Sequence, residues 1–221
     1  QTLVKTADHF EKDGVLKDMG INWPKEILQV KYGGINLTPG QELTPTQVKD
    51  QPEVTWNAEP NSLYALFFHD PDAPSRKDNH LGDVQHWAIV NIPGKNIQNG
   101  DIRAAYFGSG PREGSGLHRY VFLVFKQPSR IPLEGPVKPN NSFEGRAGQK
   151  IPLITQKFNL EGPIAANYYN CQYDDYVPTL HKQLGLNYTF FFTICAVSVS
   201  PSVPLTFFKL YFHNTDNSQL V

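Results

Sequence analysis

Three apolar runs of strand length dominate the pattern of hydrophobic and polar positions along the chain. They cover residues 63–68, 87–92 and 120–125, and a proline follows each run within a few residues. Unbroken apolar runs of about four to eight residues are typical of strands that are buried on both faces of a sheet. Long connections rich in glycine and proline separate the runs, which predicts an antiparallel or mixed sheet and not alternating strands and helices.

Shorter segments predict further elements around these strands. Residues 28–32 alternate apolar and polar side chains before two glycines, and residues 54–56 have a similar β-like composition. Pro178 is acceptable in the first turn of a helix, and Gly185 is a suitable helix terminator. Between them, four side chains have the spacing of one helical face: Val177, Leu180, His181 and Leu184.

The two ends of the chain differ from its centre. Residues 1–24 are mixed in character and predict an arm that contains a short amphipathic helix. We expect this arm to belong to one domain that covers residues 1–185. Residues 186–221 form an atypical tail that has no charged residue before position 209. Pro201 and Pro204 favour an extra strand or a poorly ordered tail over a membrane anchor.

Length, charge and cysteine usage narrow the class of protein. The 221 residues suit one domain, and the net charge of −1 gives no bulk attraction to nucleic acid or to an anionic membrane. Any bound anion therefore needs a local site, and we expect a monomer. Two cysteines, Cys171 and Cys195, form neither a disulfide framework nor a zinc motif. We expect a cytoplasmic protein, with secretion as the alternative.

Polar residues that can carry chemistry stand at the ends of the three predicted core strands. Asp70 follows the first strand, His86 enters the second, and His118 leads into the third after the glycine-rich segment 108–116. Imidazole N–H groups and glycine backbone N–H groups are suitable donors for a phosphate or carboxylate, and Asp70 would then orient a histidine. Taken singly, each feature also fits a turn, a structural histidine or a hairpin connection.

Sharper chemistries have less support. Asp70 or Asp72 with the two histidines would make a two-histidine, one-carboxylate metal site, but no HxH or HExxH spacing accompanies them. Ser109 lies between glycines, yet Phe107 stands where a nucleophile elbow needs glycine. A strand and not a helix follows this segment, which also argues against a dinucleotide fingerprint. We therefore expect no enzyme activity, no metal and no cofactor.

Four segments resemble the animal branch of the phosphatidylethanolamine-binding protein family, which includes Raf kinase inhibitor protein. The resemblance covers residues from about 25 to 185, and its two central motifs are highly specific. The matching segments are Leu43–Lys49, Asp70–Asp78, Gly108–Tyr120 and Tyr173–Pro178.

The resemblance implies a mainly β (α+β) fold with a central antiparallel sheet, a second smaller sheet and a C-terminal helix. It also implies a pocket for phosphate-type anions such as the phosphoethanolamine head group, and a cis-proline at Pro74. We therefore expect a regulatory protein that binds phosphatidylethanolamine or phosphorylated partners. The alternative is an inhibitor of protein kinases or serine proteases that acts through its outer surface. The predicted ligand-binding residues are Asp70, Asp72, His86, Gly108, Gly110, Pro111, His118, Tyr120 and His181.

Several positions depart from the family pattern at the rim of the predicted pocket. Gln85 stands where animal members often have the first histidine of a pair, and Leu81 and Val84 replace aromatic residues. His181 replaces a tyrosine of the final helix. These changes affect the predicted ligand preference more than the predicted pocket.

Overall fold

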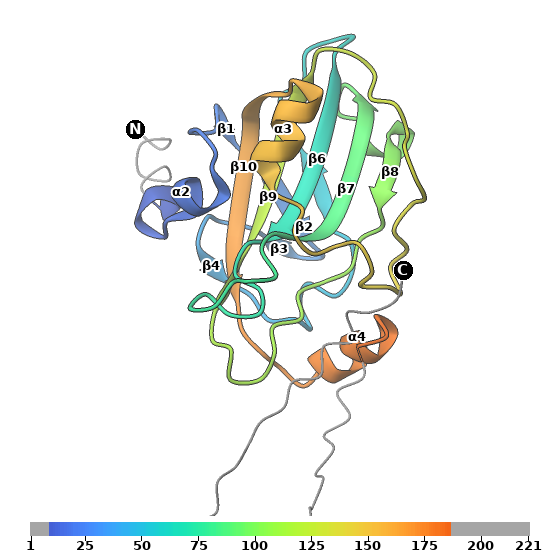
Figure 1. Cartoon of the computed structure of the whole chain (residues 1–221). Helices are drawn as coiled ribbons and strands as arrows, with labels where there is room; N and C mark the ends of the chain where they lie inside the picture. Colours follow the sequence, from blue (N-terminus) through green and yellow to red (C-terminus); the bar gives the residue numbers. More distant parts are fainter. Residues whose placement is uncertain (1–8, 187–221) are drawn as a thin grey trace, which may run out of the picture. The chain divides into compact units, whose positions relative to one another are not determined.

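A large and a small β-sheet form the framework of the computed structural model, which describes residues 9–186 (Figure 1). Within these residues the large sheet has seven strands, in the order β1-β10-β9-β6-β7-β8, with β4 also paired to β10. Its strands are β1 (Glu26–Ile27), β4 (Gln41–Glu42), β6 (Leu63–Asp70), β7 (Val84–Pro93), β8 (Asp101–Ala104), β9 (His118–Gln127) and β10 (Glu161–Cys171).

The pairing confirms the predicted mainly β fold with a second smaller sheet. Strands β10, β9, β6, β7 and β8 pair antiparallel, whereas the two-residue strands β1 and β4 both run parallel to β10. The large sheet is therefore mixed, with an antiparallel centre. The small sheet has the order β3-β2-β5. Its strands are β2 (Gln29–Tyr32), β3 (Ile35–Asn36) and β5 (Glu53–Thr55).

Both faces of the large sheet are covered, which explains the unbroken apolar runs. Along β6, Tyr64, Leu66 and Phe68 belong to the core shared with the small sheet. Ala65 and Phe67 point to the other face, where they join the core that α2 (Val15–Met19) and α3 (Ile151–Phe158) cover. In Figure 1, α3 lies across this second face.

The three apolar runs are the central strands β6, β7 and β9, as predicted. The predicted helix near the end is α4 (Val177–Gln183), with Pro178 in its first turn and Gly185 in a left-handed conformation after it. A single-turn 3-10 helix, η1 (Ile97–Asn99), precedes β8.

Strand β10 and helix α3 are absent from the sequence-based prediction. Strand β10 contains several polar residues, so it lacks the apolar run of a buried strand. Its apolar and aromatic side chains nevertheless pack in both cores. The buried amide of Asn167 is satisfied because it donates to the carbonyls of Leu28 and Leu37, at 2.8 and 3.2 Å.

The ends of the chain are described in part. Phe10, Val15 and Met19 of the predicted N-terminal arm are buried in the core that α2 and α3 cover. The predicted tail lies outside the described residues from position 187 onward. In the described part of the chain, none of the helices has the length and apolar character needed to cross a membrane.

Candidate functional site

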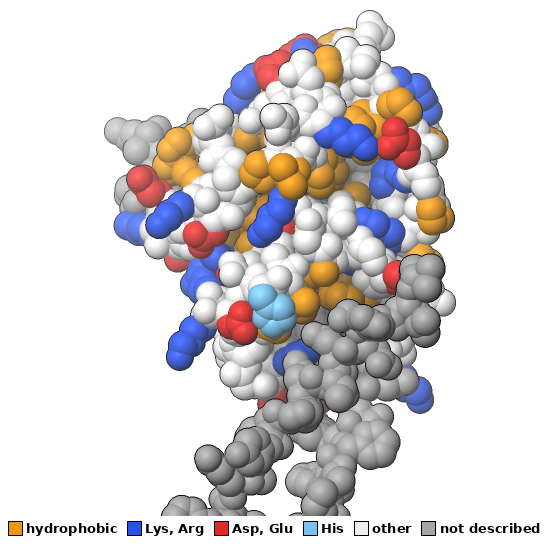
Figure 2. Space-filling model, in the orientation of Figure 1, with side chains coloured by type: hydrophobic (Ala, Val, Ile, Leu, Met, Phe, Trp, Pro, Cys, Tyr) orange, Lys and Arg blue, Asp and Glu red, His pale blue; other side chains and the backbone are white. Residues whose placement is uncertain are grey.

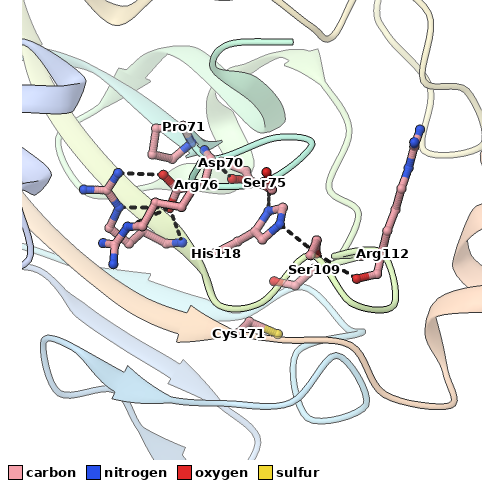
Figure 3. A network of polar contacts seen from close by, with 12 residues as sticks. Asp70, Pro71, Ser75, Arg76, Ser109, Arg112, His118 and Cys171 are labelled. Atoms are coloured by element: carbon pink, nitrogen blue, oxygen red, sulfur yellow. Dashed lines mark hydrogen bonds and ion pairs between the residues drawn. The ribbon is translucent and has the colours of Figure 1, made fainter. Parts of the chain in front are cut away.

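The predicted residues meet at one end of the large sheet. Strand β6 ends at Asp70 and its antiparallel neighbour β9 begins at His118, so the two residues lie at the same end of the strands. We call this end of the central strands the histidine edge. His86 lies near the start of β7, and α4 packs beside the glycine-rich segment that precedes β9. Figure 3 shows the polar contacts around His118 at this edge.

Asp70 and His118 form a buried pair. The Asp70 Oδ2 atom lies 2.9 Å from His118 Nδ1, and both side chains are at most 5% exposed. Burial alone would lower the pKa of His118, but the hydrogen bond and negative charge of Asp70, helped by Asp72, outweigh it and raise that pKa. Asp70 thus holds a histidine in place, as the sequence predicted.

Ser115 completes this network, and the sequence did not single it out. His118 Nε2 lies 3.0 Å from Ser115 Oγ, whose hydroxyl donates to the carbonyl of Arg112 at 2.7 Å. Because the serine hydrogen is already used, His118 donates through Nε2 as well as Nδ1, which is the arrangement of a charged imidazolium. The sequence could have indicated this contact, because Ser115 lies only three residues before His118 in the glycine-rich segment.

His86 differs from His118 in charge. Its Nδ1–H donates to the carbonyls of Phe107 and Gly108, at 3.3 and 3.1 Å. Burial lowers the pKa of His86 to about 4, although Asp70 and these carbonyls oppose the shift. The ring is therefore neutral at pH 7, with an unshared electron pair on Nε2.

Helix α4 fixes the backbone of the glycine-rich segment. His181 Nε2–H donates to the carbonyl of Gly110 at 2.9 Å. A Cβ atom at Gly110 would lie 3.0 Å from Leu180, so the absence of a side chain allows this close approach. Pro111 is buried next to Gly110, and the ring of Tyr120 stacks on His118 with centroids 6.4 Å apart.

Two predicted ligand residues make their contacts within the protein. Asp72 accepts hydrogen bonds from the backbone N–H and the guanidinium of Arg119, at 2.6 to 2.9 Å. A Cβ atom at Gly108 would lie 2.6 Å from the carbonyl oxygen of Val48. Both positions therefore have structural roles, and ligand binding by any of the nine residues stays a prediction.

Other predicted features are also placed. The Ala73–Pro74 peptide bond is cis, as the family resemblance implied. Ser109 is fully buried with its hydroxyl 2.6 Å from that of Tyr169. Among residues 9–186, no three His, Cys, Asp or Glu side chains are grouped so that they could hold a metal ion.

Comparison with known proteins decides the family. The family model described as phosphatidylethanolamine-binding protein matches residues 25–169. The chain belongs to this family. A Drosophila melanogaster member named "Putative odorant-binding protein A5" is 35% identical over 162 residues, which cover 73% of this chain and 77% of that protein. The 26 kDa secreted antigen of Toxocara canis is 37% identical over 166 residues, which cover 74% of this chain and 63% of the antigen.

Solved structures of other proteins share the fold. The solution structure of CG7054 is 44% identical, with a TM-score of 0.62 over 73% of this chain and 92% of that one. Carboxypeptidase Y inhibitor, crystallised with its cognate proteinase, has a TM-score of 0.67 over 78% of this chain and 97% of the inhibitor. Its sequence is only 23% identical, so this likeness concerns the fold alone.

Proposed function

We propose that this protein binds phosphate-type anions at the edge of the large sheet and acts as a regulatory binding protein, not as an enzyme. The observation that carries the proposal is the buried Asp70–His118 pair, in which His118 donates through both ring nitrogens. A charged donor beside a glycine-rich segment suits a phosphate oxygen better than a neutral ligand.

The two histidines would act differently on the ligand. The Nε2–H of His118 contacts the Ser115 hydroxyl, so an anion would replace or share that contact. His86 is neutral and can accept a hydrogen bond through Nε2 from a protonated phosphate oxygen. A bound dianion would instead favour proton uptake by His86.

A histidine-resolved NMR titration tests this proposal. Phosphoethanolamine should shift the ring signals of His86 and His118 in the full chain, and His118→Ala should weaken binding by about tenfold or more, as expected for a lost charge-assisted hydrogen bond. The exposed His80, which pairs with Asp78 in the connection between β6 and β7, provides the control His80→Ala. Unshifted His86 and His118 signals in the folded protein would refute the proposal.

The source of the phosphate is decided by parallel titrations. Inorganic phosphate, phosphotyrosine and phosphoethanolamine share the anion, whereas only vesicles that contain phosphatidylethanolamine present the intact lipid. Tighter binding of phosphoethanolamine than of inorganic phosphate would favour a lipid head group. Tighter binding of phosphotyrosine would favour a phosphorylated protein.

The second candidate function is inhibition of a serine protease or protein kinase through the outer surface. It is supported by the fold shared with carboxypeptidase Y inhibitor, which was crystallised with a proteinase. In that case His118→Ala should leave inhibition intact, because the pocket would be incidental. An inhibition assay with the wild-type and His118→Ala proteins separates the two functions.

The compartment is also a matter of proposal. Sequence composition favours the cytoplasm, whereas similarity to a protein named as a secreted antigen supports the secreted alternative. We infer that secretion is the better-supported of the two. Detection of the protein in the medium and not in the cell lysate would establish it.

A further inference from the structure

A second cavity lies on the face of the large sheet that α3 covers. Its volume is about 720 Å³, within the range of small-molecule sites. The wall is built by β6, β7 and β8, by the long connection between β9 and β10, and by α3. In Figure 2, basic and hydrophobic side chains lie beside one another on this face.

Most of the cavity wall is apolar. Phe67, Ala88 and Val90 come from the sheet, and Ile131, Ile154 and Phe158 face them from the connection and α3. One lining residue of the connection, Val137, is a large hydrophobic side chain that is 48% exposed. An apolar molecule bound here would bury surface that is otherwise in contact with water.

One end of the cavity is polar, and Lys138, which can only donate, determines which groups there donate and which accept hydrogen bonds. Lys138 Nζ donates to Gln85 Oε1 at 2.9 Å, and Gln85 Nε2 lies 3.4 Å from His69 Nε2. This direction leaves the proton of neutral His69 on Nδ1, an atom that is buried and has no hydrogen-bond partner. Gln85 and His69 thereby hold the ammonium group of Lys138 at the cavity wall.

The basic side chains at this end have no ion-pair partner among the described residues. Within residues 9–186, no carboxylate lies in ion-pair contact with Lys138, Arg103 or Arg146. Arg103 donates to the carbonyls of Glu134 and Gly135, and Arg146 donates to backbone carbonyls alone. Burial, with the charges of Arg146 and Arg103, lowers the pKa of Lys138 to about 8.

Neither acidic residue of the described wall forms an ion pair with Lys138, although Lys157 and, to a smaller extent, the charge of Arg103 lower the pKa of Glu134. Glu134 pairs with Lys157 at 2.9 Å, and both side chains are exposed. Glu144 is exposed as well. A half-buried ammonium group without a carboxylate is electrostatically unfavourable, and an anionic ligand would remove that cost.

We propose that this cavity binds an amphiphilic monocarboxylate, such as a medium-chain fatty acid, with its carboxylate on Lys138 and its chain against Phe67, Val90 and Phe158. The ammonium group of Lys138 lies beside the neutral amide of Gln85 and offers a place for one carboxylate, while the apolar wall suits an alkyl chain.

Gln85 contacts Lys138 and His69 at this cavity and not at the rim of the predicted anion pocket, whereas His86 contacts carbonyls of the glycine-rich segment. The cavity is therefore separate from the histidine edge and does not rest on the function proposed there.

Titration of the full chain with decanoate below its micellar concentration tests this site. Backbone NMR signals of Gln85, Ala88, Val90 and Lys138 should shift. Lys138→Gln should weaken binding by about tenfold or more, whereas Lys138→Arg should retain most of it. Lys31→Gln, at an exposed lysine of the small sheet, is the matched control.

Decanol and decyltrimethylammonium separate charge from apolar burial. Both should bind at least about tenfold more weakly than decanoate, because neither offers an anion to Lys138. Equal affinity for decanol, an unchanged affinity in folded Lys138→Gln, or shifts confined to His86 and His118 would each overturn the assignment. His118→Ala should leave decanoate binding unchanged, which keeps this test independent of the phosphate titration.

Discussion

Three histidines are buried in the large sheet, and their neighbours favour the charged form of one and the neutral form of the other two. His118 faces the carboxylate of Asp70, so its pKa is raised despite burial. His86 and His69 contact neutral groups, so burial lowers their pKa values to about 4 and about 3. Residue type alone does not decide the charge of such a side chain.

Replacement of Asp70 tests the cause of the raised pKa. In Asp70→Asn the negative charge is lost while burial remains, so the pKa of His118 should fall below its ordinary value near 6.5. An NMR pH titration of the histidine ring measures it. Asp78→Asn, at the exposed partner of His80, should leave His118 unchanged. A His118 pKa that stays raised in Asp70→Asn would contradict this explanation.

The same pair makes folding depend on pH in a definite direction. A histidine whose pKa is raised by folding stabilises the folded state fully below its unfolded pKa, and the effect is lost as pH rises through the folded pKa. His118 should therefore contribute stability below about pH 6.5. Asp70→Asn should remove that contribution.

His69 should have the opposite effect. Burial, aided by the charges of His86 and Lys138, lowers its pKa to about 3, so the unfolded chain binds a proton that the folded chain does not. Its contribution is present above about pH 6.5 and is lost as pH falls. In His69→Gln, the free energy of unfolding should fall less steeply between about pH 6 and 4, by up to about 1.4 kcal/mol per pH unit. Urea unfolding at several pH values measures the slope, and His80→Gln is the exposed control.

At the scale of elements, one ion pair joins three parts of the fold. Arg119 at the start of β9 binds Asp72, which follows β6, and also reaches Asp18 in α2 at 2.7 Å and the carbonyl of Asp13. The Asp72 side chain is 1% exposed. Asp70 and Asp72 are close in sequence but have different partners, because Asp72 binds Arg119 whereas Asp70 binds His118.

Loss of this buried partner should be costly. Asp72→Asn leaves Arg119 without its innermost carboxylate, and we expect a destabilisation of about 3 to 5 kcal/mol in urea unfolding. The exposed pair of Glu134 and Lys157 gives the control, since Glu134→Gln should cost less than about 1 kcal/mol. Equal effects of the two substitutions would mean that Asp72 is not a structural anchor.

At the scale of the whole molecule, the edges of the large sheet favour a monomer. The outermost strands β1, β4 and β8 have only two, two and four residues. Short edge strands offer few unpaired backbone groups to another chain. Sedimentation of the full chain should give a species of about 24.9 kDa at all concentrations. A concentration-dependent rise in mass would contradict the monomer.

The sequence by itself determined the central strands, helix α4 and the group of residues at one sheet edge. Apolar runs, helical spacing and the family motifs are local signals, so they survive without coordinates. The sequence did not reveal β10, because a buried polar residue such as Asn167 interrupts its apolar pattern and is satisfied by the carbonyls of Leu28 and Leu37. That information is spread over distant positions.

Only the tertiary structure decided the charge of each histidine and the separate duties of Asp70 and Asp72. The physical reason is that pKa values and ion pairs depend on burial and on partners far away in sequence. The same reason applies to the cavity beside Lys138, whose walls come from β6, β7 and β8, from the connection after β9 and from α3. Sequence reasoning found the predicted phosphate edge through its motif, whereas the cavity has no motif and was seen only once the sheet and α3 were in place.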